Sequence, residues 1–301
     1  MPGPYRLRPG SREGSLKVTE QRDAAPRAPE GVDTEKPSAA RIYDWYLGGT
    51  QNWAVDREFG RRMEQQWPLV RPGSKQNREF MNRAVRAALR AGIRQFVDLG
   101  SGVPTAGNVH EVVEAELPED HDAKVVYVDY EPVAVAHATL ILEEGVATDW
   151  AGIVQADMRD AKAVLRAEET KRLIDFSKPV CLIMAAVLHF VGPDDDPEGL
   201  LEAYRNALAP GSWLAISQMS EGDGDGPYLE GLRWFVEQYR KTSNPVWLRD
   251  REEIEPLFGD WTVLEPGIVH LPDWRPDRKI NALEAEARPF AWCAVAEKPG
   301  A

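Results

Sequence analysis

The residues with the clearest chemical signature follow a short apolar strand that begins at Gln95 and is closed by Asp98. Gly100, Ser101 and Gly102 come next. Glycines let the backbone turn sharply and approach a ligand where a Cβ atom would collide. The pattern predicts a ligand-binding turn to which Asp98 and the three following small residues contribute.

A helix is expected after this turn, from Asn108 to about Leu117, with apolar residues on one face. Asn108 and Glu111 have the form of a capping box, which marks the start of the helix. The first turn of a helix directs unpaired N–H groups at whatever lies over the preceding loop. Strand, turn and helix together indicate the first half of a nucleotide-binding βαβ unit.

The second strand of this unit runs from Lys124 to Asp129 and indicates which nucleotide to expect. An acid at its carboxyl end, Asp129, can accept both hydroxyls of a ribose, and its neighbour Tyr130 is assigned to the same site. The third glycine of a dinucleotide fingerprint is missing, because Thr105 fills its place. Asp98 would repel a phosphate and suits a cationic amino-acid tail. These features favour S-adenosylmethionine over NAD as the cofactor.

The third predicted strand ends at Gln155 and leads to Asp157 and Met158. Asp157 can accept a hydrogen bond from the exocyclic amine of an adenine, with the Met158 backbone beside it. Alternatively, Asp157 caps the helix expected near Asp160.

A fourth strand, apolar on both faces, leads into His189. Ligands of open α/β sheets bind at the carboxyl ends of such central strands, so His189 is the candidate catalytic residue. An imidazole can act there as a general base or as a hydrogen-bond partner that orients an acceptor. The alternative is a histidine that only caps local backbone groups.

Three regions are expected along the chain. Residues 1–35 lack an apolar period and are predicted to form a disordered arm, and residues 36–92 a helical lid or flank. The third helix of that flank is expected from Lys75 to Ala91, with Ser74 as its cap. Residues 93–301 form the main domain. Several residues of the flank are predicted to cover the cofactor: Tyr43, Tyr46, Gly48, Gly49 and Asn52.

Composition limits the possible partners. The 301 residues carry a formal net charge of −13, which disfavours nucleic acid. No apolar run is long enough for a membrane helix, and no signal peptide is recognised, so a cytoplasmic protein is expected. Cys181 and Cys293 lie in apolar runs and are expected to be buried thiols. The acidic segments at 194–196 and 221–226 lack a metal-ligand pattern, so no metal is predicted.

The end of the chain is expected to supply two more strands, Trp261 to Leu264 and Phe290 to Glu297. The polar link between them, from Pro272 to Arg288, is predicted to lie on the surface.

From about Pro37 to Lys298, the chain resembles the class I S-adenosylmethionine-dependent methyltransferases. It is most similar to an actinobacterial group called S-adenosyl methyltransferase, formerly a domain of unknown function. The stretch 40–49, with Asn52 and the Asp56-Arg57 pair, carries this resemblance together with 98–102 and 187–191. Trp45 and Trp53 depart from the pattern, where Tyr and Phe are expected.

The resemblance implies an α/β fold with a Rossmann-like seven-stranded sheet of order 3-2-1-4-5-7-6, strand 7 antiparallel. It also implies methyl transfer from S-adenosylmethionine, and it leaves the acceptor open; a small molecule is expected. Two other functions remain possible at this stage. One is a non-enzymatic module that binds S-adenosylmethionine or S-adenosylhomocysteine and regulates a partner, and the other is a nicotinamide-dependent oxidoreductase.

Overall fold

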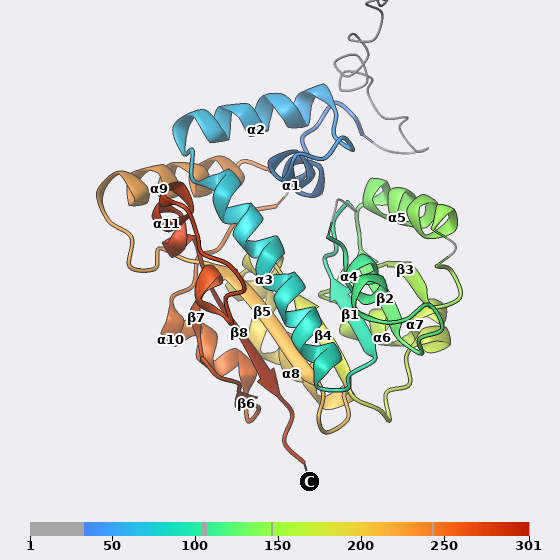
Figure 1. The fold of residues 1–301 in the computed structure, drawn as a ribbon. Helices are drawn as coiled ribbons and strands as arrows, with labels where there is room; N and C mark the ends of the chain where they lie inside the picture. Colours follow the sequence, from blue (N-terminus) through green and yellow to red (C-terminus); the bar gives the residue numbers. More distant parts are fainter. Residues whose placement is uncertain (1–32, 104–106, 146, 243, 301) are drawn as a thin grey trace, which may run out of the picture.

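One mixed sheet forms the centre of the protein, whose computed structural model describes residues 33–103, 107–145, 147–242 and 244–300 (Figure 1). The strand order is β3-β2-β1-β4-β5-β8-β6, and β8 runs antiparallel to its neighbour β5. This order confirms the predicted class I methyltransferase sheet. The principal strands are β1 (Gln95–Leu99), β2 (Lys124–Asp129), β3 (Ala151–Gln155), β4 (Val180–Met184), β5 (Trp213–Met219) and β8 (Ala291–Glu297).

The edge of the sheet differs from the prediction. Two short strands, β6 (Thr262–Val263) and β7 (Val269–His270), both pair with β8, where a single strand was expected. The chain between them turns at Pro266 and Gly267, and the Gly267 N–H donates to the Leu264 carbonyl at 2.9 Å. Proline has no N–H to donate to a ladder, so the strand is interrupted there. In the described part of the chain, the sheet therefore has eight strands in place of seven.

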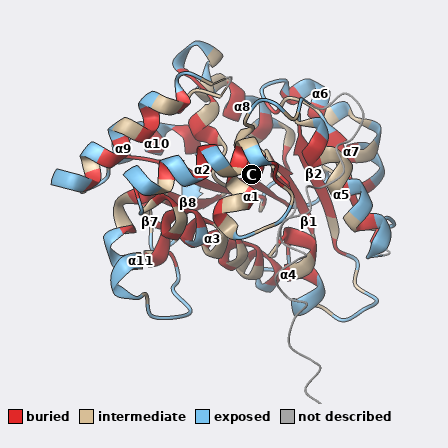
Figure 2. Cartoon of the chain, turned by 90° about the horizontal axis from the view of Figure 1, so that it is seen from above, coloured by how far each residue is buried: buried red, intermediate tan, exposed pale blue. Residues whose placement is uncertain are grey.

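Side chains of the central strands alternate between two apolar layers. Phe96 and Ile183 face the layer formed with α3 (Val70–Arg90), α4 (Val109–Glu116) and α9 (Gly226–Tyr239). Val97 and Leu182 face the opposite layer. Its helices are α6 (Ala161–Arg166), α7 (Glu168–Leu173), α8 (Pro197–Ala207) and α10 (Arg251–Ile254). Figure 2 shows the sheet buried between helices whose outer surfaces are exposed.

Two N-terminal helices, α1 (Ala39–Leu47) and α2 (Ala54–Gln66), lie above the carboxyl ends of the parallel strands (Figure 1). Helix α5 (Pro132–Glu144) packs beside β2 and β3. The predicted start of α4 is confirmed, because Glu111 accepts from the Asn108 N–H at 3.2 Å. Cys181 and Cys293 are free and buried, as expected. No helix in the described part of the chain is long and apolar enough to cross a membrane. Most of the predicted N-terminal arm lies outside the described residues.

Two predictions about this part of the fold are wrong. Helix α3 begins at Val70, since Pro72 is tolerated in a first turn, and the Ser74 hydroxyl donates to the Val70 carbonyl at 2.8 Å instead of capping a later start. The link after residue 272 is not confined to the surface. It contains Trp274, which is fully buried with its ring 5.5 Å from that of Phe80, and a short helix, α11 (Ala282–Glu286).

Candidate functional site

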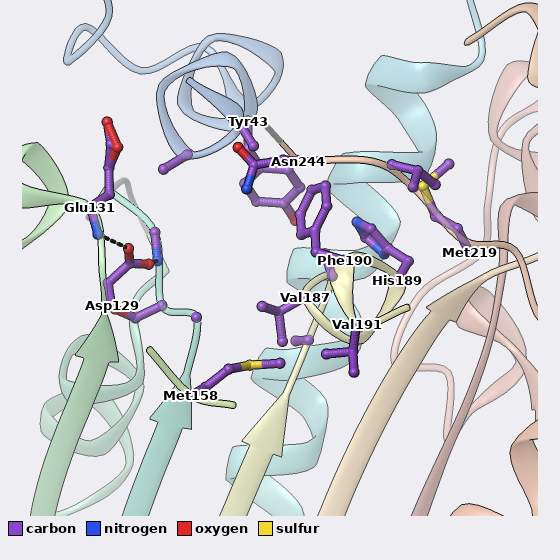
Figure 3. Close-up of a pocket in the computed structure, with 18 of the residues that line it drawn as sticks. Tyr43, Asp129, Glu131, Met158, Val187, His189, Phe190, Val191, Met219 and Asn244 are labelled. Carbon is purple, nitrogen blue, oxygen red and sulfur yellow. Dashed lines mark hydrogen bonds between the residues drawn. The ribbon is translucent and has the colours of Figure 1, made fainter. Parts of the chain in front are cut away.

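A cavity of about 490 Å³ opens where the central parallel strands end, beneath α1. Its walls come from the glycine turn, from the loops after β2, β3 and β4, from the end of β5, and from α1, α3 and α9. This volume lies in the range of small-molecule sites in proteins. The close-up in Figure 3 shows side chains from these separate segments converging on one space.

The predicted glycine turn forms one end of this cavity. Gly100 and Gly102 have φ of +66° and +69°, a region that favours glycine. A Cβ atom on Gly100 would stand 2.1 Å from the Cγ2 atom of Val187, whereas a Cβ atom on Gly102 would meet nothing within 4 Å. Gly100 therefore allows the turn to pack against the loop after β4, and Gly102 leaves room for a ligand.

Two buried carboxyl groups stand beside the turn. Asp129 accepts from the Gly102 N–H at 2.8 Å and from the Glu131 N–H at 2.9 Å, and burial raises its pKa to about 6. Burial raises the pKa of Asp98 to about 7, although the positive charge of Arg78 opposes this rise. Desolvated carboxylates gain from a ligand that brings positive charge or hydrogen-bond donors.

Residues at this end of the cavity fit S-adenosylmethionine. The Ser101 hydroxyl is buried and has no partner among the described residues, so it can bond a ligand. Asp98 suits the ammonium group of the amino-acid tail, and the guanidinium of Arg78 suits its carboxylate. Asp129 retains acceptor capacity for ribose hydroxyls. Sequence reasoning missed Arg78, because a single arginine in the amphipathic helix α3 carries no motif.

The loop after β3 contributes Asp157 and Met158 to the lining. Asp157 forms an ion pair with Arg159, with 2.7 Å between Oδ2 and Nη2. The alternative in which Asp157 caps the next helix is wrong, since Asp160 is the cap and accepts from the Ala163 N–H at 2.9 Å. The side chain of Met158 points into the cavity in Figure 3.

Tyr130 lies at the edge of the same cavity and is half exposed. Its hydroxyl accepts from the Asn244 amide at 2.6 Å, which links the loop after β2 to the segment after α9.

His189 lies in a 3₁₀ turn, η1 (Leu188–Phe190), directly beyond β4. The side chain is buried, and burial together with the charge of Arg249 lowers its pKa to about 3. Its Nδ1 atom has no hydrogen-bond partner in the described part of the chain. The imidazole therefore does not cap backbone groups through Nδ1, and it remains neutral at physiological pH.

Two of the five predicted covering residues line the cavity, Tyr43 and Tyr46 of α1. The Tyr43 hydroxyl accepts from the Asn77 amide at 2.8 Å and donates to the Ser74 carbonyl at 3.1 Å. Asn77 in turn accepts from the Ser217 hydroxyl at 2.5 Å. This chain of hydrogen bonds connects α1 through α3 to strand β5.

Gly48, Gly49 and Asn52 stand outside the cavity lining. Gly48 is the C-cap of α1, and its left-handed φ of 87° lets the chain turn out of the helix. The buried Asn52 amide donates to Asp44 at 2.7 Å and to the Gly49 carbonyl at 3.0 Å. These contacts give the three residues a structural part in shaping the loop between α1 and α2.

A buried ion cluster holds α1 against the loop after β2. This cluster was not predicted from the sequence. The guanidinium of Arg41 pairs with Asp56 at 2.7 Å and with Glu131 at 2.9 Å, and the arginine is 1% exposed. Ser38, the residue before α1, donates to Glu131 at 3.1 Å. Because Glu131 follows Asp129 by two residues, the cluster ties the helices above the cavity to the proposed ribose-binding loop.

Comparisons with known proteins identify the family of the chain. The sequence profile described as S-adenosyl methyltransferase matches residues 25–299. A Thermobifida fusca YX protein, described provisionally as a methyltransferase, is 34% identical with a TM-score of 0.81, covering 90% of this chain and 98% of its own. A DUF574 family protein from Streptomyces avermitilis MA-4680 is 34% identical with a TM-score of 0.78, covering 89% and 99%.

A more distant structure shares the fold. Magnesium protoporphyrin IX methyltransferase from Synechocystis PCC 6803, solved with bound S-adenosylhomocysteine, is 14% identical with a TM-score of 0.50 and covers 85% of this chain and 92% of its own. No curated protein matches the chain. The matched profile spans nearly the whole described fold, and the chain therefore belongs to the S-adenosyl methyltransferase family, whose cofactor is S-adenosylmethionine.

Proposed function

We propose that the protein transfers a methyl group from S-adenosylmethionine to a small-molecule acceptor inside this cavity. The observation that carries the proposal is that one cavity is lined both by the glycine turn at Gly100–Gly102 and by His189. A cofactor held at the turn and an acceptor held near His189 would therefore share one cavity. Among the described residues that line the site, no feature favours a nicotinamide cofactor or a purely regulatory module.

S-adenosylmethionine supplies an electrophilic methyl group on a sulfonium sulfur. The chain's own residues have to bind the cofactor and the acceptor, orient them and exclude water, since much of the barrier to such a displacement is set by their alignment. In the proposal Asp98, Ser101, Gly102 and Asp129 bind the cofactor together with Arg78. Tyr130, Asp157 and Met158 contribute on the adenosine side, and Tyr43 and Tyr46 cover the site.

His189 is proposed to orient the acceptor through a hydrogen bond. A pKa of about 3 leaves its imidazole neutral at pH 7, but it also makes the ring a weak base. A neutral imidazole can still donate at one nitrogen and accept at the other. The burial of His189 therefore supports orientation over proton removal.

The cofactor and the reaction can be tested separately. Calorimetry with S-adenosylmethionine, S-adenosylhomocysteine and NADH should give binding of the first two alone. A screen of small-molecule extracts with methyl-labelled cofactor, followed by mass assignment, should give a product. Binding of NADH instead would contradict the proposal, and cofactor binding without any transfer would favour a regulatory module.

Once an acceptor is known, two variants of His189 separate its possible roles. His189→Gln should retain much of kcat, because glutamine can also donate and accept, whereas His189→Ala should lose about 10-fold or more. A general base would make both variants fall by about 10²-fold or more. His137→Gln, on α5 and outside the cavity lining, is the matched control and should leave kcat unchanged.

A further inference from the structure

We propose that the part of the cavity farther from the glycine turn accepts a flat, uncharged aromatic molecule with one hydroxyl or amine group. This part, here called the aromatic chamber, is lined by Tyr46, Phe190, Met219, Phe235, Tyr239 and Val246. The inference rests on the proposed function, because it names the chemical class of the methyl acceptor.

Three rings form a row along the chamber wall. The ring centroids of Phe190 and Tyr239 are 6.4 Å apart with 32° between their planes, and those of Tyr239 and Phe235 are 4.6 Å apart with 33° between them. The rings come from two separate elements, η1 and α9. Aromatic pairs at such separations attract each other beyond simple area burial, so a row of rings suits a further aromatic ring.

The remaining wall is apolar and adaptable. Met219 ends strand β5, and Val246 lies in the segment after α9 that lines the cavity. Methionine is flexible and polarizable, and its sulfur makes favourable contacts with aromatic rings. Tyr46 of α1 completes the lining and is 2% exposed. Phe190 is the one half-buried residue of the six and offers the most contact area to a planar ligand, while the buried side chains form the wall around it.

Charged side chains of the cavity are not chamber residues. They are Arg78, Asp98, Asp129, Glu131, Asp157, Arg159, Asp194 and Asp195. Arg78 interacts with Asp98, and Arg159 pairs with Asp157 and lies 3.5 Å from Asp195. Burial raises the pKa of both Tyr46 and Tyr239, so their phenols stay neutral. An ion in the chamber would lose its hydration without gaining a counter-charge from these six residues, which is strongly unfavourable.

Polar groups near the chamber are mostly engaged. The Asn77 amide bonds both the Tyr43 and the Ser217 hydroxyls, and the Ser74 hydroxyl bonds the Val70 carbonyl. Two groups differ, because neither the His189 Nδ1 atom nor the Tyr46 hydroxyl has a hydrogen-bond partner among the described residues. The Tyr46 hydroxyl interacts with the neighbouring Tyr239 side chain, which leaves the imidazole as the group available to a ligand. One neutral imidazole suits a ligand with a single hydroxyl or amine group rather than a polyhydroxylated one.

A probe series with one ring system and three charges tests this inference. At pH 7 and saturating S-adenosylhomocysteine, calorimetry would compare 2-naphthol (neutral), 2-naphthoate (anionic) and 2-naphthylmethylammonium (cationic). We expect 2-naphthol to bind at least about 30-fold more tightly than either ion, because neither charge would be compensated. Equal or tighter binding of an ion, or no binding of 2-naphthol, would overturn the inference.

Matched variants test the location. Phe235→Leu keeps an apolar side chain but removes a chamber ring, and it should weaken 2-naphthol roughly three- to tenfold. Phe59→Leu is the control, since Phe59, on α2, is buried against Tyr239 but does not line the cavity. Phe190→Leu, at a half-buried position, repeats the test if Phe235→Leu folds poorly. Equal affinity in chamber and control variants would overturn the placement.

Binding of S-adenosylhomocysteine, measured in each variant, keeps the two proposals apart. It should be unchanged in all three phenylalanine variants, because none of these rings belongs to the cofactor-binding set. If the wild-type protein failed to bind S-adenosylhomocysteine, the proposed function would fail. The same probe series, measured without S-adenosylhomocysteine, would still show which charge the chamber prefers.

Discussion

Replacing Gly100 with alanine tests the geometry of the glycine turn, and Gly102 supplies a matched control. The two residues have nearly the same left-handed φ, +66° and +69°, so an added Cβ atom meets a similar φ penalty at both. Their surroundings differ, because a Cβ atom would stand 2.1 Å from Val187 at Gly100 and would meet nothing within 4 Å at Gly102. The pair therefore separates backbone strain from steric collision.

The expected magnitudes follow from these two effects. Left-handed backbone costs a non-glycine residue about 1–2 kcal/mol, which is the loss of unfolding free energy expected for Gly102→Ala. Forcing a methyl group into a packed site costs a further 1–3 kcal/mol or so, giving roughly 2–5 kcal/mol in total for Gly100→Ala. Gly102→Ala should in addition weaken the binding of S-adenosylhomocysteine, since the methyl group of the new alanine points into the cavity.

Urea unfolding of the ligand-free protein measures the first quantity, and calorimetry measures the second. The double variant Gly100→Ala/Val187→Ala should recover about 1–3 kcal/mol relative to the sum of the single variants, because it removes the collision. Equal destabilisation by Gly100→Ala and Gly102→Ala, without coupling to Val187, would refute the proposed packing between the turn and the loop after β4.

Four further outcomes are expected. Asp129→Ala should weaken S-adenosylhomocysteine by about 2–3 kcal/mol, the scale of lost hydrogen bonds to a charged group; an unchanged Kd in a folded variant would remove it from the site. Arg41→Met should lower the unfolding free energy by about 3–5 kcal/mol because it leaves two acids without their partner, whereas the exposed Arg172→Met should cost less than about 1 kcal/mol. Burial raises the pKa of Asp98 to about 7 from its ordinary value of 3.8, so the native state binds more protons between these values and stability falls as pH rises through them. Asp98→Asn should therefore stabilise the ligand-free protein more at pH 8 than at pH 5 in urea titrations, and an equal effect at both would contradict the raised pKa. Hydrogen exchange over residues 39–47 should slow on adding S-adenosylhomocysteine, and unchanged exchange would make α1 a packing element only.

Local features of the site could be predicted from sequence. The strand into Asp98, the two glycines and the start of α4 are specified by neighbouring residues, and the structure has them as expected. The order of the sheet was also predicted, but only through resemblance to a family, because alternation of apolar residues does not say which strands are neighbours.

Other features depend on contacts between distant parts of the chain. The charge of Arg78 acts on Asp98, 20 residues farther along the chain, and Arg41 pairs with Glu131 across 90 residues. Trp274 looks like part of a polar surface link, yet it is buried against α3. Nothing within a few residues of these positions reports the partner, so no local pattern could reveal them.

His189 shows the division most clearly. The sequence places His189 directly after a central strand. This position predicts that the residue lies at the carboxyl edge of the sheet, where ligands bind. Its protonation depends on how completely the surrounding elements exclude water and on the charge of Arg249, which lies 60 residues farther along the chain. Sequence thus determined which residue reaches the cavity, and tertiary structure decided its charge, because desolvation is a property of everything packed around a group.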